Sequence, residues 1–117
     1  MTSRDRAGLV TLAAVLGVSC SSGEARGRRI YAERGCAVCH GQAGHGDGPT
    51  AARLDVPPRD LANPLAYRNG AGPDEIAASI RRGSGTMPPF RDITNDESKD
   101  IAAWIVSLQR AAGANAR

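Results

Sequence analysis

The hydrophobic positions of this 117-residue chain recur at helical spacing, most clearly near its C-terminal end. One set stands at i, i+3, i+4 and i+7 and would share a helix face: Ile101, Trp104, Ile105 and Leu108. The capping box Thr94-Asn-Asp-Glu97 predicts the start of this helix, and Gly113 predicts its end. Because no segment alternates convincingly with period two, we predict an all-α domain.

A second helix is predicted near the start of the domain, over residues 24–34, with Ser21 or Ser22 as its N-cap and Gly35 as its stop. Its stripe at helical spacing consists of Gly27, Ile30, Tyr31 and Arg34. A glycine in such a stripe permits close approach by another helix. The other arginines of this segment, with Arg34, are expected on its solvated side.

Between these two helices the chain is rich in glycine and proline. Residues 41–49 hold four glycines and predict a loop, and the prolines predict an extended segment over residues 53–64. A short helix is predicted over residues 63–70, with Asn63 as its cap and Pro64 at its first position. Another is predicted over residues 72–82 before Gly83.

The composition suggests a single domain with little core of its own. Hydrophobic residues make up 41% of the chain, but only four residues are aromatic. The formal charge of +3 comes without any Lys/Arg run of the kind that follows a phosphate backbone, so we expect no nucleic-acid partner. A buried prosthetic group would supply the missing apolar bulk.

The N-terminal stretch resembles an export signal. Arg4 and Arg6 precede an apolar run over residues 9–18, which is shorter than the roughly twenty residues of a spanning helix. We assign residues 1–19 to a signal peptide, with an uncleaved anchor as the alternative.

Cys20 follows in a context like the bacterial lipoprotein box, although Gly17 stands where leucine is usual. Lipidation would use this otherwise unpaired cysteine; an unmodified thiol is the alternative. Residues 20–23 would form a tether and residues 24–117 the domain.

The motif Cys36-Ala37-Val38-Cys39-His40 has the spacing that attaches a c-type haem. The i, i+3 separation puts both sulfurs on one side of a helical turn, within reach of the two vinyl groups of one porphyrin. His40 then lies under the iron as an axial ligand. The sequence therefore predicts one covalent haem c, bound through Cys36 and Cys39.

Elimination gives a candidate for the other axial ligand. Beyond Cys20, the chain offers one methionine, Met87, and one further histidine, His45. His45 follows His40 by only five residues and would have to pass around the porphyrin edge. Met87 lies between two predicted helices, beside two prolines that restrict the backbone. We therefore predict Met87 as the sixth ligand, with a gap-filling core residue as the alternative.

Two other uses of the same cysteines are less suitable. A thiol redox site of the CxxC type would need a thioredoxin-like αβ context, which the helical pattern does not provide. A zinc site from Cys36, Cys39, His40 and His45 would need the neighbouring Cys39 and His40 to converge tetrahedrally.

At this point the chain resembles a class I c-type cytochrome of bacterial type. The resemblance covers nearly all of residues 24–110 and is carried, in order, by Tyr31, Cys36 to Gly41, Gly46 to Pro49, Leu54, Gly85 to Phe90 and Asp100 to Leu108. It implies the cytochrome c fold, in which the first and last helices cross and short helices and loops wrap around one haem. The crossing maps to Gly27 and Trp104.

The resemblance also implies residues around the haem. The Pro49 carbonyl would accept the His40 ring N–H and fix its orientation. Leu54 would pack on the haem, and Arg53, Arg59 and Tyr67 are candidates for its propionates. His45 is expected to face solvent or to lie near a propionate.

The expected function is that of an electron carrier and not of an enzyme. With both axial positions filled, the iron would offer no open site to a substrate, and electrons would leave by the haem edge near Ala37, Cys39 and the loop over residues 87–90. Redox partners would dock there weakly on a monomer, at the periplasmic side of a bacterial membrane if Cys20 is lipidated and free in the periplasm otherwise. The alternatives are a gas-binding or sensing protein with a displaceable Met87, and a dedicated subunit of a dehydrogenase or oxidase complex.

Overall fold

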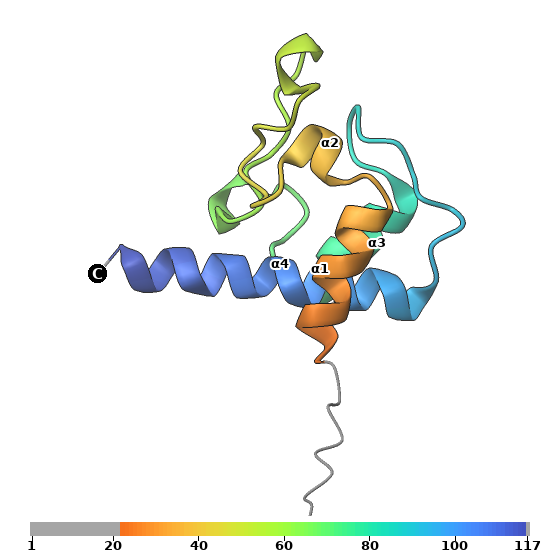
Figure 1. Cartoon of the computed structure of the whole chain (residues 1–117), viewed down its shortest axis with the longest axis vertical. Coiled ribbons are helices and arrows are strands. Elements are labelled where there is room, and N and C mark those ends of the chain that lie inside the picture. The colour runs from red at the N-terminus through yellow and green to blue at the C-terminus, as the bar shows by residue number, and fades with distance from the viewer. Residues whose placement is uncertain (1–21, 117) are drawn as a thin grey trace, which may run out of the picture.

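The computed structural model describes residues 22–116, and this part of the chain is helical (Figure 1). Its elements are α1 (Gly23–Glu33), α2 (Ala37–His40), the 3-10 turns η1 (Ala51–Arg53) and η2 (Pro64–Ala66), α3 (Pro73–Arg82) and α4 (Asn95–Asn115). Within residues 22–116 the only strand-like pairing is an isolated bridge between Ser84 and Met87. The all-α prediction is confirmed.

Helices α1 and α4 cross at a glycine. The Ser22 hydroxyl caps α1 by accepting from the Ala25 N–H at 3.2 Å. A Cβ atom at Gly27 would overlap the carbonyl oxygen of Asp100, so only glycine lets the two backbones approach this closely. One turn later the Tyr31 and Trp104 rings pack with centroids 4.5 Å apart. The crossing expected at Gly27 and Trp104 is present, and Tyr31 is the ring partner of Trp104.

Helix α4 packs against both α1 and α3. Its predicted capping box is formed: the Thr94 hydroxyl accepts from the Glu97 N–H at 3.1 Å, and the Glu97 carboxylate accepts from the Thr94 N–H at 2.9 Å. The helix passes its predicted end at Gly113 and continues to Asn115. A Cβ atom at Gly113 would meet no other part of the fold within 4 Å. An exposed glycine weakens a helix by about 1 kcal/mol but does not by itself end it.

Helix α3 lies where it was predicted and packs against α4, but the helix expected over residues 63–70 is wrong in length. Only the single turn of η2 forms there, with the Asn63 side chain accepting from the Leu65 N–H at 3.0 Å. Leu65 is 92% exposed, so a longer helix would have no apolar face to bury. Tyr67 instead leaves the turn and donates its hydroxyl to the Leu61 carbonyl.

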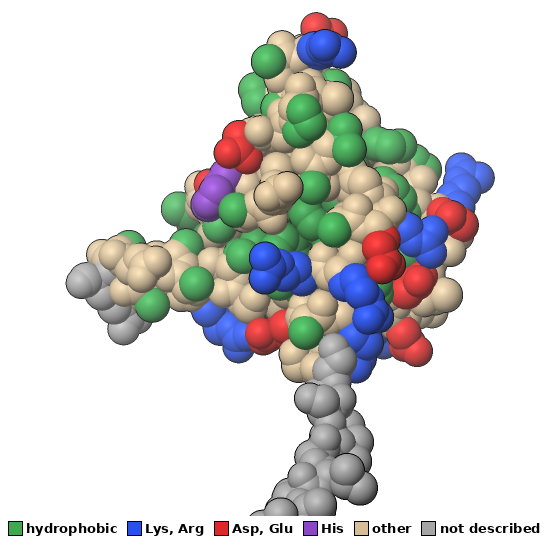
Figure 2. Space-filling model, in the orientation of Figure 1, with side chains coloured by type: hydrophobic (Ala, Val, Ile, Leu, Met, Phe, Trp, Pro, Cys, Tyr) green, Lys and Arg blue, Asp and Glu red, His purple; other side chains and the backbone are tan. Residues whose placement is uncertain are grey.

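The loops expected around the site all rise from one side of α4 (Figure 1). Residues 41–50 fold back over α2, and Gly46, at φ +80°, lies so close to the Pro58 carbonyl that a Cβ would overlap it. The loop from α3 to α4 lies on the same side of α4 as α2. In Figure 2 many of the charged side chains lie low on this face, around α1 and the start of α4, and hydrophobic side chains are numerous above them. Within residues 22–116 no helix is long and apolar enough to cross a membrane.

Candidate functional site

The two cysteines of the CxxCH motif lie on one helical turn and are not joined to each other. Cys36 directly precedes α2, Cys39 lies within it, and both are free thiols. Burial raises the pKa of Cys36 to about 11, so this thiol stays protonated at neutral pH, unlike the thiolates of redox CxxC sites. Cys39 Sγ lies 3.3 Å from the Thr50 hydroxyl. The pair has the placement that the haem interpretation requires.

The His40 ring is held by a backbone carbonyl. Its Nδ1 lies 3.0 Å from the Arg59 carbonyl oxygen, which makes Nδ1 the protonated nitrogen and leaves Nε2 as the lone-pair donor. Burial lowers the pKa of His40, against the smaller opposing effect of this hydrogen bond. A neutral imidazole with a fixed ring is the form that binds a metal.

This acceptor differs from the one we expected. Pro49 stands between two residues that donate to α2: the Gly48 N–H bonds to the Cys39 carbonyl and the Thr50 N–H to the Val38 carbonyl. It therefore lies beside the carbonyl end of α2, while the extended segment at Arg59 passes the His40 ring. The acceptor role that the resemblance gave to Pro49 is taken by Arg59, nineteen residues beyond His40.

The end of α2 is also fixed by a buried tyrosine. The Tyr31 hydroxyl donates to the Gly41 carbonyl at 2.6 Å, and burial raises the pKa of this phenol above its usual range. The same ring packs on Trp104 of α4. The helix crossing is thus tied directly to the residue that follows His40.

The predicted sixth ligand lies in a tight loop. Backbone hydrogen bonds join Met87 to Ser84 in both directions, at 3.0 and 3.1 Å. The Met87 side chain is half-buried and packs at the edge of the core, where Cys36 and Phe90 also pack. The structure thus brings Met87 and the CxxCH turn to the margin of one apolar cluster, forty-seven residues apart in sequence.

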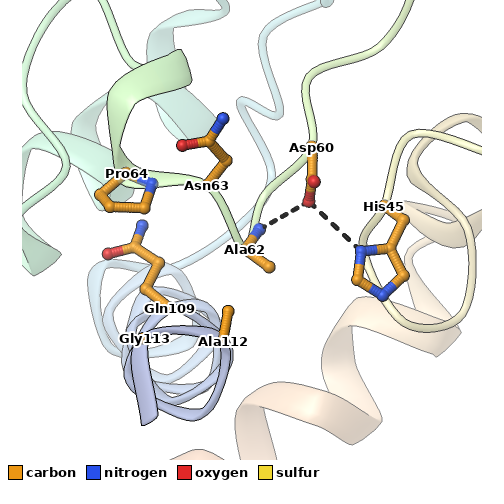
Figure 3. A pocket seen from close by; sticks show the side chains of 8 residues that line it. All are labelled: His45, Asp60, Ala62, Asn63, Pro64, Gln109, Ala112 and Gly113. Atoms are coloured by element: carbon orange, nitrogen blue, oxygen red, sulfur yellow. Dashed lines mark hydrogen bonds and ion pairs between the residues drawn. The ribbon is translucent and has the colours of Figure 1, made fainter. Parts of the chain in front are cut away.

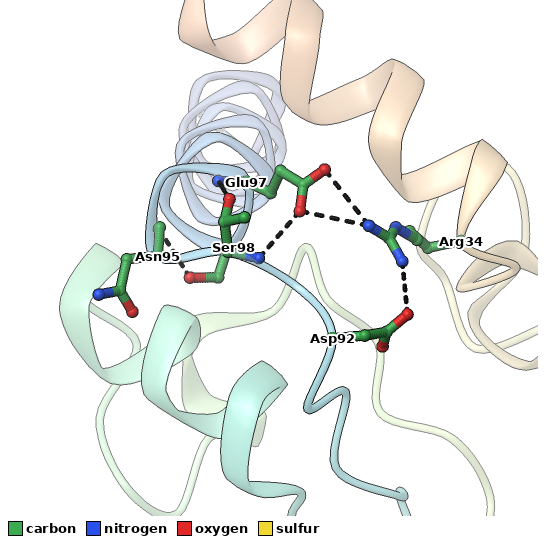
Figure 4. Close-up of polar contacts among 6 residues, drawn as sticks. Arg34, Asp92, Asn95, Glu97 and Ser98 are labelled. Atoms are coloured by element: carbon green, nitrogen blue, oxygen red, sulfur yellow. Dashed lines mark hydrogen bonds and ion pairs between the residues drawn. The ribbon is translucent and has the colours of Figure 1, made fainter.

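An ion-pair cluster that the sequence did not reveal anchors the end of this loop (Figure 4). The Arg34 guanidinium binds the Asp92 carboxylate at 2.8 Å and the Glu97 carboxylate at 3.3 Å. We expected Arg34 on the solvated side of its helix, but it joins the end of α1 to the loop and to the first turn of α4. No local pattern marks such a pair, because its partners are 58 and 63 residues away.

Of the three residues expected to bind the haem propionates, Arg59 and Tyr67 contact each other and Arg53 lies apart on η1. The Arg59 guanidinium lies over the Tyr67 ring, 4.8 Å from its centroid, and the Tyr67 hydroxyl donates to Leu61. Arg53 is exposed on η1, beside Leu54, which is 40% exposed. Contact of these four side chains with a haem stays a prediction.

His45 faces solvent. Its ring Nδ1 lies 3.4 Å from the Asp60 carboxylate, and both side chains are about half exposed. The two residues line an open hollow of about 390 Å³ between the 60–64 segment and α4 (Figure 3). Among residues 22–116 no three His, Cys, Asp or Glu side chains are grouped so that they could hold a metal ion, so the four residues of the zinc alternative do not come together.

The residues around α2 fit a haem in chemistry as well as in spacing. Two free thiols and a neutral, oriented imidazole share one turn. The Met87 side chain, a thioether, packs against the same apolar cluster as Cys36. Two large apolar side chains beside this turn are left exposed by the protein itself: Val38 in the motif, and Leu54 at the end of η1, which contacts α2. An apolar surface of this kind is what a porphyrin face covers.

The chain is similar to a known protein family and to two known proteins. Residues 23–105 match the family described as cytochrome C oxidase, cbb3-type, subunit III. The chain is 30% identical over 90 residues to cytochrome c-551 of Ectopseudomonas mendocina, covering 73% of this chain and 100% of that protein. It is also similar to a chain of the reducing HAO-like protein complex of Kuenenia stuttgartiensis, with a TM-score of 0.66 and 27% identity over 74% of this chain. That solved chain is longer, and the match spans 43% of it.

Proposed function

Since the chain belongs to the class I c-type cytochromes, in the family described as cytochrome C oxidase, cbb3-type, subunit III, we propose that it carries single electrons on one haem iron held between His40 and Met87. It is a haem electron-transfer protein and not itself an enzyme. The observation that carries the ligand proposal is the hydrogen bond from His40 Nδ1 to the Arg59 carbonyl, because it presents Nε2 as a ready ligand.

The chain's own residues would do three things for the haem, which when bound supplies the change between ferric and ferrous iron. Cys36 and Cys39 would form the two thioether bonds. His40 and Met87 would keep the coordination closed, so that no substrate or water binds. The apolar side chains of Val38 and Leu54 would limit water at the porphyrin, which keeps the reorganisation on oxidation small.

Redox partners are implied by this function, and we propose that they dock at the exposed surface around α2. Val38 is 46% exposed there, next to both haem-binding cysteines. A small surface of this kind suits a weak, transient complex. A fixed place in a larger assembly is the second candidate, and the similarity to a chain of the Kuenenia complex favours it. Stable co-purification with a redox enzyme would distinguish the second candidate from free exchange.

We also propose the periplasmic side of a bacterial membrane as the location, with the chain held by a lipid on Cys20. The support is the export-like stretch over residues 1–19 and the attachment of c-type haem outside the bacterial cytoplasm. Both this stretch and Cys20 lie outside the residues that the structure describes.

The ligand proposal is tested by Met87→Leu in the holoprotein. Leucine keeps the volume of the side chain but offers no sulfur, so we expect the sulfur-to-iron charge-transfer band of the ferric protein to disappear and the reduction potential to fall. Thr86→Ala, in the same loop, is the control and should leave both unchanged. A Met87→Leu spectrum equal to that of the original protein would show that another group is the sixth ligand.

The same experiment separates the carrier from a gas-binding protein. With Met87 in place, the ferrous protein should bind carbon monoxide slowly or not at all, and Met87→Leu should bind it readily. Rapid binding by the unmodified protein would favour the sensing alternative.

A further inference from the structure

The carbonyl that accepts the His40 hydrogen bond belongs to a short segment, residues 59–61, that is held from several sides. At its beginning, the Arg59 oxygen lies 3.0 Å from His40 Nδ1. At its end, the Leu61 N–H donates to the Gly44 carbonyl at 2.6 Å, and the Leu61 side chain is buried. The position of the Arg59 oxygen therefore depends on how Leu61 is held.

Two side chains from different parts of the fold meet at the Leu61 carbonyl. The Tyr67 hydroxyl donates to it at 2.9 Å, and the Gln109 amide, from α4, donates at 3.5 Å. A carbonyl oxygen accepts two such donors. Tyr67 and Gln109 therefore share one acceptor, the Leu61 carbonyl.

Figure 3 shows the side of this segment that faces the hollow. Asp60 accepts there from the Ala62 N–H at 3.0 Å and lies 3.4 Å from the His45 ring. Gln109 reaches toward the segment from α4. Leu61 is held in addition by its side chain, which is only 7% exposed, and by two part-buried hydrogen bonds to its carbonyl.

The strength of the His40 hydrogen bond matters to the iron. A carbonyl that accepts the Nδ1 proton makes the imidazole a stronger donor, which stabilises the ferric state more than the ferrous state. We propose that Tyr67 and Gln109 are positioning residues for the haem iron: they hold the Leu61 carbonyl, and through it keep the Arg59 carbonyl in place under the His40 ring. This role presupposes that His40 ligates the iron, as proposed above. Gln109 lies beyond residue 105, where the family match ends.

The test uses Tyr67→Phe and Gln109→Leu in the holoprotein. Phenylalanine keeps the ring under the Arg59 guanidinium and removes only the hydroxyl, and leucine keeps the approximate size of Gln109 without its donor. Each change should lengthen the His40 hydrogen bond, raise the reduction potential and speed exchange of the His40 Nδ1 proton, measured by NMR in the ferrous state. The double variant should shift both quantities further in the same direction.

Arg110→Gln is the matched control, because it removes an exposed ion pair of α4 with Glu24 on α1 and not a contact with residues 59–61. It should leave the potential and the proton exchange unchanged. If both Tyr67→Phe and Gln109→Leu behave like Arg110→Gln, or if the potential falls, the positioning role is wrong. Should Tyr67→Phe fail to bind haem, Gln109→Leu decides alone, because its side chain is only half-buried.

The sulfur-to-iron charge-transfer band separates this result from a failure of the ligand proposal. A band retained in the variants together with an unchanged potential rejects the positioning role alone. A band missing from the unmodified protein rejects the Met87 ligation and leaves the His40 measurement valid.

Discussion

The Glu97 carboxylate serves two purposes at the start of α4. It accepts from the Thr94 N–H, which closes the capping box, and it faces the Arg34 guanidinium at the end of α1. The Thr94 backbone lowers the pKa of Glu97 most, burial opposes this, and Arg34 lowers it further. One side chain thus couples the helix start to the ion-pair cluster that anchors the Met87 loop.

This coupling makes a pH-dependent contribution to stability. A carboxylate whose folded pKa is lowered stabilises the fold fully above its unfolded pKa, and the stabilisation is lost as the pH falls through the folded pKa. Glu97→Gln should therefore lower the melting temperature at neutral pH, and the difference from the original protein should shrink in acid. Thermal unfolding across pH measures it, with Glu33→Gln, in an exposed pair with Arg29, as the control. A difference that is constant with pH would contradict the assigned cause.

Among helices, the crossing of α1 and α4 is the contact on which the fold depends most visibly. Gly27 lets the backbones touch at Asp100 and Ile101, and Ile101 is 1% exposed beneath it. The Arg26 and Asp100 side chains then bind each other at 3.0 Å at the edge of the same contact. A change at Gly27 acts on backbone atoms, which cannot move aside as a flexible side chain can.

Two glycine-to-alanine changes should therefore have opposite signs. Gly27→Ala should destabilise the protein by about 1 to 3 kcal/mol, the usual cost of overpacking, even though alanine favours the helix. Gly113→Ala, in the exposed end of α4, should stabilise it by up to about 1 kcal/mol. Denaturant unfolding of the holoprotein gives both values. If both changes raise the free energy of unfolding by the same amount, α1 can move away from α4.

The helices were predictable where a local signal and a buried face agree. The capping box of α4 and its apolar stripe, which includes Ile101 and Trp104, predicted that helix correctly, because both signals are formed by residues close together in sequence. The segment after Asn63 has a cap but no face to bury, and the Tyr67 hydroxyl bonds to the Leu61 carbonyl instead.

The residues of the site also divide into those that the sequence predicts and those that depend on contacts between distant segments. Cys36, Cys39 and His40 are marked by spacing, and Met87 by elimination. The Arg59 carbonyl, Gln109 and the partners of Arg34 could not be found, because each acts through a contact between distant segments, and a backbone carbonyl carries no residue signature at all. The resemblance offered Pro49 for the His40 hydrogen bond, but the fold brings a later segment to that ring.

At the scale of the molecule, the start of α1 lies far from α2, the turn that carries the CxxCH motif. In Figure 1, α1 begins at the end away from α2 and runs toward it. Its eleven residues span about 16 Å at 1.5 Å per residue. A chain held through Cys20, just before this helix, would therefore present α2 away from the membrane and toward its redox partners.

This arrangement makes lipidation separable from haem binding. Cys20→Ser should move the protein from the membrane fraction to the soluble fraction of the cell envelope, because a serine offers no thiol for a lipid, while haem content and reduction potential stay unchanged. Mass spectrometry of the mature N-terminus checks the lipid directly, and Ser22→Ala, which alters only the cap of α1, should stay with the membrane. An original protein found wholly in the soluble fraction with an unmodified Cys20 would exclude the anchor and leave the electron carrier intact. The reason is that the contacts that build the site, from Tyr31 to Gln109, all lie within the domain beyond this tether.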